Sequence, residues 1–512
     1  MPKQLSRLRP TKGLCNDLPP WESSPEFYSR LRNIVIRSGF PQRVGGRRAA
    51  YDPPSAAPYH NFNCPMLGSN FWLYQSLNRI FCVAVGAHTD ITPAGGPMPN
   101  SITKASQWSH AILNGIPVFN NTLDDPCYWL GVPAVDAVTL PGWPANTKAA
   151  LIAQHRFHLF ALDISVSAVR NGNLFLWSNA AVPGSIPSTW APSATNEAGS
   201  GQVSDTPGTI TAARSLRDTF MIYKSNACYA VDYVGGNEKF TKKLLWSRAG
   251  ALSPRAVDDA NGWHAVVTEG DIVRNDGYSQ PVSIAEALVR KFLFDQISVA
   301  NYEALQVLYD FVNGDVWILF PEGGATFCTV ALVYNVASNG WGVVDLQDIA
   351  YANFGIVDDI GASGSWDTDS GLWDDDNTAW NESSLTAAIE RMVCSRPGST
   401  QLQMINSGSD LTVMDSLVAK YSMTFGAPEQ IKFVRQVHLR GRGFGTFYVR
   451  VGFQMFPDAL TTWADEVTVT DPGQPVPIFT QGRYISIEVR AADNAVYDFT
   501  GFDFEVETRG YF

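Results

Sequence analysis

The sequence has little charge and no close pair of cysteines. Lys, Arg, Asp and Glu make up 17% of the 512 residues, well under the roughly 25% of average globular proteins. The cysteines are scattered along the chain, at Cys15, Cys64, Cys82, Cys127, Cys228, Cys328 and Cys394. This spacing offers neither a C-x-x-C metal knuckle nor a disulfide framework. We therefore expect buried thiols in a chain that is assembled in a reducing cytoplasm and holds no cofactor.

Long apolar runs and catalytic motifs are also missing. No run approaches the roughly 20 apolar residues of a membrane-spanning helix, and no apolar stretch follows the polar N-terminus as in a signal peptide. The motifs G-x-S-x-G, H-E-x-x-H and the P-loop do not occur, and the glycines of 441–445 lack nucleotide-loop spacing and precede a strand. We expect no membrane anchor and no enzymatic activity. Carboxylate pairs for glycan cleavage need only spatial proximity, so the sequence leaves that class open.

Positive charge is concentrated at the N-terminus. The net charge is −12, but residues 1–50 hold ten Lys and Arg against three acids, so the remainder is acidic. An acidic body argues against a dedicated nucleic-acid reader, because phosphate neutralisation supplies most of such affinity. We expect residues 1–50 to form an extended basic arm that docks on a partner chain, with a nucleic-acid arm as the alternative. The cations expected to dock are Arg7, Arg9, Lys12, Arg30, Arg32, Arg37, Arg43, Arg47 and Arg48.

What the sequence does contain is a succession of short β-strand signals. From about 58 to 355, runs rich in Val, Ile, Tyr, Phe and Trp alternate with Gly, Asn, Asp and Pro turns. For example, 158–162 and 174–177 flank Asn171-Gly172-Asn173, which predicts a hairpin. Repeated antiparallel strands must close or stack to hide their edges. At roughly 40–50 residues per four-stranded blade, the all-β fold predicted is a β-propeller of six or seven blades.

Alternation marks a second β-module near the C-terminus. Phe447, Val449 and Val451 alternate with polar or small residues, which predicts strands buried on one face in an antiparallel β-sandwich. Ser283 and Glu286 have capping-box spacing before a short helical pattern. The predicted organisation is a basic arm (1–50), a propeller (51–355), an acidic linker (356–395), strands that return to the propeller (396–430) and a sandwich (431–512).

Two groups of residues are candidate metal ligands. A seven-residue Trp-Asp repeat supplies carboxylates that suit Ca²⁺, although the EF-hand pattern fails and a solvated linker is the alternative. The carboxylates are Asp367, Asp369, Asp374, Asp375 and Asp376. His155 and His158 are three residues apart in a strand-like run, which predicts that they lie on opposite faces and share no metal.

Several stretches share a pattern with one protein family. They include Leu18-Pro19-Pro20-Trp21, His88-Thr89-Asp90-Ile91-Thr92-Pro93, Asn114-Gly115-Ile116-Pro117-Val118, Leu216-Arg217-Asp218-Thr219-Phe220, Asp276-Gly277-Tyr278-Ser279-Gln280-Pro281 and Asn339-Gly340-Trp341-Gly342. Together with the Trp-Asp repeat they resemble the tail hub, or nozzle, proteins of short-tailed bacteriophages, which stabilise packaged DNA. The resemblance covers nearly the whole chain, and its motifs are structural rather than chemical.

The resemblance implies a structural protein of the virion tail, assembled in the host bacterial cytoplasm. It implies a ring, expected to be a hexamer, that lies below the portal adaptor protein, extends the DNA channel, retains packaged DNA and docks tail fibres, tailspikes or needle proteins. An acidic wall would let DNA pass without sequence-specific binding. The alternative is a carbohydrate-binding or glycan-cleaving propeller at a host-contact surface, in which Trp129, Trp190 and Trp263 stack on sugars.

Overall fold

The computed structural model describes residues 4–66, 68–84, 86–236, 238–357, 390–405, 414–471, 473–491 and 496–511. Strands dominate these ranges. The helical elements are η1 (Pro93–Gly95), η2 (Ala105–Gln107), α1 (Arg290–Gln296), η3 (Tyr302–Ala304) and η5 (Pro397–Ser399). No helix in the described ranges has the length and apolar character needed to cross a membrane.

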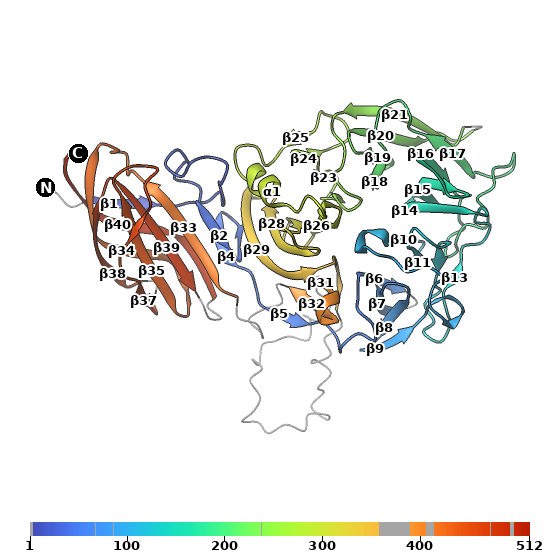
Figure 1. Cartoon of the computed structure of the whole chain (residues 1–512), viewed down its shortest axis with the longest axis horizontal. Helices are drawn as coiled ribbons and strands as arrows, with labels where there is room; N and C mark the ends of the chain where they lie inside the picture. The colour runs from blue at the N-terminus through green and yellow to red at the C-terminus, as the bar shows by residue number, and fades with distance from the viewer. Residues whose placement is uncertain are drawn as a thin grey trace, which may run out of the picture.

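In the described residues, seven groups of four antiparallel strands form a β-propeller; six are separate sheets and one is part of a larger sheet (Figure 1). Blade one is β6 (His60–Met66), β7 (Ser69–Gln75), β8 (Ile80–Ala84) and β9 (Ala87–Asp90). Blade two is β10 (Ser109–Leu113), β11 (Ile116–Asn120), β12 (Cys127–Tyr128) and β13 (Val138–Thr139). Blade three is β14 (Thr147–His155), β15 (His158–Val166), β16 (Val169–Trp177) and β17 (Gly199–Gln202). Blades four and five are β18 (Ile210–Leu216), β19 (Thr219–Lys224), β20 (Ala227–Tyr233), β21 (Phe240–Ser247); and β22 (Val257–Asp259), β23 (His264–Val267), β24 (Ile272–Asn275), β25 (Val282–Ser283). Blade six is β26 (Gln306–Asp310), β27 (Asp315–Phe320), β28 (Cys328–Asn335) and β29 (Gly340–Ile349). Blade seven contains β30 (Tyr351–Ile356), β31 (Glu390–Arg396) and β32 (Gln401–Ile405).

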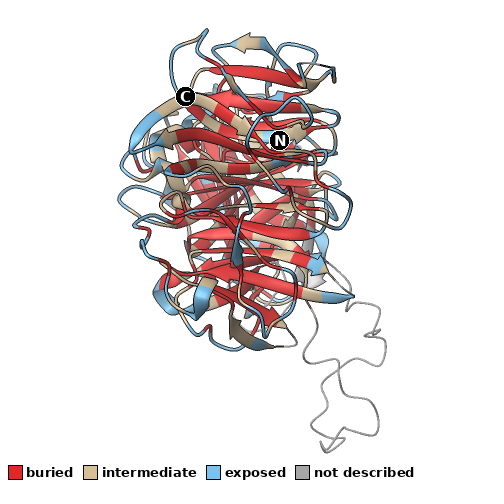
Figure 2. Ribbon diagram, turned by 90° about the vertical axis from the view of Figure 1, so that its right-hand side faces the viewer, coloured by how far each residue is buried: buried red, intermediate tan, exposed pale blue. Residues whose placement is uncertain are grey.

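The fourth strand of blade seven comes from the other end of the chain. β5 (Arg47–Ala49) pairs with β32, so the Arg47–Ala49 segment closes the ring that begins at β6. Apolar side chains then fill the space between adjacent blades, as between blades three and four, where Phe160, Phe175, Phe220 and Tyr229 are buried together. Figure 2 shows these buried strands running through the molecule, with exposed residues mostly in the connections.

The second module is the predicted antiparallel sandwich. One sheet contains β1 (Gln4–Leu8), β40 (Val496–Tyr511), β34 (Gln430–Phe444) and β38 (Pro475–Gly482). The other contains β2 (Arg30–Arg32), β33 (Ser416–Met423), β39 (Tyr484–Ala491), β35 (Phe447–Gln454), β36 (Thr462–Trp463) and β37 (Val467–Val469). Phe447, Val449 and Val451 are fully buried, as their alternation predicts. The glycines of 441–445 lie at the end of β34 and in its connection to β35.

The expected separate arm at residues 1–50 is wrong. β1 pairs with β40, β2 with β33, and β3 (Ile34–Arg37) with both β29 and β4 (Phe40–Arg43). Because β4 also pairs with β40, blade six and one sandwich sheet merge into a single ten-stranded sheet. The physical reason is the apolar run Ile34–Ile36, whose three side chains are at most 1% exposed and form part of the core.

Other boundaries also differ from the expected ones. β31, expected in the acidic linker, belongs to blade seven, and β33, expected to return to the propeller, belongs to the sandwich. The hairpin of β15 and β16 forms, but its turn lies at Ser167 and Ala168, which adopt positive φ, rather than at Asn171-Gly172-Asn173. These two residues supply the left-handed backbone that a tight hairpin turn requires.

The predicted helix begins later than its capping box. Ser283 Oγ does accept a hydrogen bond from the backbone N–H of Glu286, at 3.0 Å. However, Ala287 has φ of 59°, and α1 starts only at Arg290. Its first N–H groups donate instead to the carboxylate of Asp17, at 3.0 Å from Arg290 and 2.9 Å from Lys291. A side chain 273 residues away therefore caps this helix.

Candidate functional site

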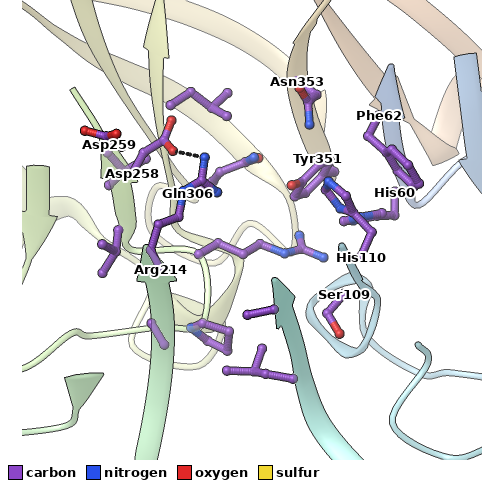
Figure 3. A pocket seen from close by; sticks show the side chains of 18 of the residues that line it. His60, Phe62, Ser109, His110, Arg214, Asp258, Asp259, Gln306, Tyr351 and Asn353 are labelled. Atoms are coloured by element: carbon purple, nitrogen blue, oxygen red, sulfur yellow. Dashed lines mark hydrogen bonds and ion pairs between the residues drawn. The ribbon is translucent and has the colours of Figure 1, made fainter. Parts of the chain in front are cut away.

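A cavity of about 530 Å³ lies among the innermost strands of the blades. The first strand of each blade lines it, because these seven strands surround the propeller axis. Its polar lining residues, seen in Figure 3, include His60, Ser109, His110, Arg214, Asp258, Asp259, Gln306, Tyr351 and Asn353. The lining is mixed, since apolar residues such as Ile112, Leu151, Val257 and Leu308 separate the polar ones.

A second cavity of about 740 Å³ adjoins the first at one end of the inner strands. Residues 209–211 of the β18 region line this second cavity, and residues 212–214 line the first. Leu151 of β14 lines both cavities, and so does Pro254. The two cavities therefore adjoin at Leu151 and Pro254.

Aromatic rings and imidazoles form one wall of the central cavity (Figure 3). His60 Nε2 lies 2.8 Å from His110 Nδ1, a hydrogen bond in which one ring donates to the other. The His110 ring stacks on Phe62, with centroids 3.9 Å apart and an interplanar angle of 5°. Tyr351 packs on the His60 ring, with centroids 3.8 Å apart. Inner strands of blades seven, one and two thus meet in this wall.

Both imidazoles are held neutral. Burial lowers the pKa of His60 well below its usual value, with His110 and Arg255 adding to the effect. Burial, followed by the charges of Arg214 and Arg255, lowers the pKa of His110 to about 3. At neutral pH the pair can therefore donate or accept hydrogen bonds but carries no charge. His60 is 2% exposed, and its Nδ1 atom has no hydrogen-bond partner.

Arg255 is the buried cation of this wall. It is 9% exposed, and its guanidinium lies 4.5 Å from the centroid of Tyr351. The guanidinium donates to the backbone oxygens of Ala350, at 3.1 Å, and of Ala105. Burial lowers its pKa to about 10, so it remains charged at neutral pH. Among the described residues, no carboxylate forms an ion pair with Arg255.

The carboxylates of the cavity lie elsewhere, beside a different arginine. Arg214 of β18 forms an ion pair with Asp258 of β22 (Figure 3). Asp258 also accepts the backbone N–H of Tyr309, at 2.8 Å, and burial raises the pKa of its carboxyl. Asp259 accepts the N–H of Gly262, at 2.9 Å. The Arg214 side of the cavity therefore holds one cation and two carboxylates, whereas the cation on the Arg255 side has no ion-pair partner among the described residues.

Of the nine cations expected to dock on a partner, five have the following contacts within the chain. Arg37 forms an ion pair with Asp315, Arg32 with Asp345, and Lys12 with Glu26, at 2.6, 2.5 and 2.6 Å. Arg43 donates to Met414 O, and the buried Arg47 donates to Asp345 O. Arg7 and Arg9 are exposed in and after β1, Arg30 is exposed in β2, and Arg48 lies in β5. Contacts within the chain therefore involve at least five of the nine.

The remaining residues singled out in the sequence are the acidic residues of the Trp-Asp repeat, the cysteines and three tryptophans. Asp367, Asp369, Asp374, Asp375 and Asp376 lie outside the described residues. Within the described ranges, no cluster of three His, Cys, Asp or Glu is suited to a metal ion. All seven cysteines are free and buried. The tryptophans considered for sugar stacking, Trp129, Trp190 and Trp263, are at most 5% exposed and pack inside the propeller.

The prediction that His155 and His158 lie on opposite faces is wrong. A turn at residues 156–157 separates them, and they are directly paired across β14 and β15. Directly paired residues lie on the same face of a sheet. His155 Nδ1 is bonded to Ser215 Oγ and His158 Nδ1 to Ser178 O, both at 2.9 Å. Both histidines are buried in the propeller and have hydrogen-bond partners within it.

Sequence reasoning missed the central cavity entirely. His60, His110, Arg255 and Tyr351 lie in four different blades or connections, up to 291 residues apart, and no motif links them. The feature of the sequence that could have located the cavity is the position of these residues in their strands, because His60, His110 and Tyr351 all lie at or near the start of an inner strand. It becomes readable only when the blade boundaries are known.

No protein-family model and no curated protein matches the chain. Similar solved structures include the extracellular domain of a hybrid two component system from B. thetaiotaomicron (9% identity, TM-score 0.34, 63% of this chain) and PorZ of the type-IX secretion system from Porphyromonas gingivalis (8%, 0.38, 77%). A third is the Cps50 (Swd1) β-propeller domain from Myceliophteria thermophila (7%, 0.40, 70%). The match covers 39%, 44% and 99% of these chains, respectively. At such identities and scores, the likeness concerns the propeller fold and carries no argument about function.

Proposed function

We propose that this chain is a structural subunit of the tail of a short-tailed bacteriophage, acting as the hub or nozzle below the portal adaptor. In this role it retains packaged DNA, lets it pass during infection and gives fibres or spikes a docking surface. The resemblance of its motifs to the tail hub family motivates the proposal. A ring of copies, a hexamer in the family, is part of it.

The observation that supports this role most directly is the continuous ten-stranded sheet. Hydrogen-bonded strands run from blade six through β3 and β4 into the sandwich. A flexible linker would let the two modules rotate independently, as is usual where domain interfaces are small. Here a shared sheet and a common apolar core, which includes Ile34, Val316 and Phe504, restrain that motion. Such a subunit suits a part that must keep its shape under pressure.

The test is to locate the protein in the particle. Purified virions labelled with an antibody against this chain are expected to carry the label at the distal end of a short tail in electron micrographs. Preimmune serum on the same particles is the control. Label on peripheral fibres or spikes would favour the glycan-binding alternative, and unlabelled particles that also lack the chain on immunoblots would overturn the proposal.

Oligomerisation is tested separately with the purified full-length chain. We expect mass photometry to show a discrete species near six times the 56.0 kDa of the monomer, alone or after addition of the portal adaptor. A monomer under every condition, including a stoichiometric mixture with the adaptor, would overturn the ring. The labelling experiment alone would then test whether the protein is located in the virion tail.

A further inference from the structure

The Arg255 side of the central cavity holds a positive charge that the described residues leave uncompensated. A buried charge is costly unless it is paired, even when hydrogen bonds to carbonyl groups remove part of the penalty. Asp258 and Asp259 do not supply the pairing, because they are bonded to Arg214 and to a turn on the other side. The cation of Arg255 therefore remains available to pair with an anion in the cavity.

Hydrogen-bonding groups beside Arg255 are also available. The hydrogen bond with His60 uses His110 Nδ1 and leaves Nε2 of the His110 ring for a ligand, whereas His60 Nδ1 is buried out of reach. The His110 ring is only partly buried and lines the cavity, as does Ser109 (Figure 3). Neutral imidazole and hydroxyl groups can donate to a carboxylate without adding charge.

The rest of the lining indicates the size and character of the ligand. A volume of about 530 Å³ falls within the usual range for small-molecule sites. Aromatic and aliphatic residues, among them Phe62, Leu308 and Phe354, form much of the wall. A bare inorganic ion would leave this apolar surface unused.

From these observations we propose that the central cavity of the propeller binds the carboxylate group of a small organic acid, placed against Arg255 with His110 as a hydrogen-bond donor. The carbon skeleton of the acid packs on the apolar wall formed by residues such as Phe62, Leu308 and Phe354. The carboxylate could belong to a free organic acid or to an acidic side chain of a peptide, and both present the same chemistry to the site. This inference is independent of the tail-hub role.

Isothermal titration calorimetry on the full chain at pH 7 and low salt tests the proposal. The probes are glutarate, citrate, a short Asp/Glu peptide and inorganic sulfate. We expect saturable binding of at least one carboxylate with one site per chain. Tighter binding of the peptide would identify a polypeptide source, and tighter binding of glutarate or citrate a free acid.

Variants distinguish the site from general anion binding. Arg255→Gln is expected to raise the Kd at least tenfold. Because Arg255 also bonds to backbone oxygens, His110→Phe is the second variant, since it keeps the stacking on Phe62 but removes the donor. We expect it to raise the Kd at least threefold. The control is Lys243→Gln, an exposed residue of β21 outside the cavity, which should change the Kd less than twofold.

Three results would overturn the proposal. They are the absence of saturable carboxylate binding, a Kd that neither cavity variant changes, and sulfate binding as tight as that of the best carboxylate. The last result would indicate a simple ion site. None of them bears on whether the chain lies in a virion tail.

Discussion

The guanidinium of Arg37 in β3 lies 2.6 Å from the fully buried carboxylate of Asp315 in β27. Asp315 also accepts a hydrogen bond from Asn335 Nδ2, at 2.8 Å. Burial raises the pKa of the Asp315 carboxyl, and the charge of Arg37 opposes that shift. The pair therefore anchors the N-terminal segment to blade six at a point that water does not reach.

Removing Arg37 should destabilise the protein strongly. Arg37→Ala leaves the Asp315 charge buried without its cation, which typically costs about 3–5 kcal/mol. Chemical denaturation followed by tryptophan fluorescence would measure this change in the free energy of unfolding. Arg32→Ala is the matched control: Arg32 pairs with Asp345 but is half exposed, so we expect a loss of at most about 1 kcal/mol. Adding Asp315→Asn to Arg37→Ala should restore part of the loss, and equal losses in the two single variants would contradict the argument.

Deleting residues 1–50 should disrupt the fold rather than only an interface. The deletion removes β5 from blade seven, β2 from the sandwich sheet that contains β33, and β1, β3 and β4 from the shared ten-stranded sheet. We expect aggregation, or a fall of more than 10 °C in the melting temperature, as measured by differential scanning calorimetry; for a chain of this size that corresponds to several kcal/mol. Deletion of residues 1–8 removes only β1 and is the control. A stable, monodisperse chain without residues 1–50 would restore the interpretation of a free arm.

Acid should destabilise the protein partly through His264. Its Nε2 lies 3.1 Å from Ser215 O and its Nδ1 lies 2.9 Å from the Tyr223 hydroxyl, an arrangement that fits the neutral ring. Burial lowers its pKa to about 4, whereas the unfolded chain titrates near 6.5. Below pH 6.5 the unfolded state therefore binds more protons, and stability falls as the pH decreases towards 4, by up to about 3 kcal/mol from this residue. In His264→Gln, the free energy of unfolding should depend less on pH between 6.5 and 4; an unchanged slope would contradict the prediction.

Gly13 should tolerate substitution less than Gly115. Both have φ near 80°, a conformation that costs other residues about 1 kcal/mol. A Cβ at Gly13 would also lie 2.2 Å from the carbonyl oxygen of Trp341, whereas Gly115 has open space. We expect Gly115→Ala to lose about 1 kcal/mol and Gly13→Ala clearly more, because Gly13 holds the N-terminal segment against blade six. Urea denaturation of the two variants would rank them, and equal losses would show that the segment can shift.

Local patterns were sufficient to predict the strands and the two β-modules. Alternation at Phe447, Val449 and Val451 predicted their burial correctly, and the strand pairs of the propeller were recognisable from apolar runs and turn residues. The partner of β5 could not be predicted, because Arg47–Ala49 pairs with residues about 350 positions later. The basic residues of 1–50 showed that this segment is positively charged. They did not show whether carboxylates of a partner chain or of the chain itself would pair with them.

The sequence alone determined the class of the fold, because side-chain periodicity and turn chemistry act over a few neighbouring residues. Tertiary structure decided the number of blades, the role of the N-terminal segment and the existence of the central cavity. His60, His110, Arg255 and Tyr351 acquire their shared environment only when seven inner strands close into a ring. Ring closure depends on contacts between residues hundreds of positions apart, which no local pattern specifies.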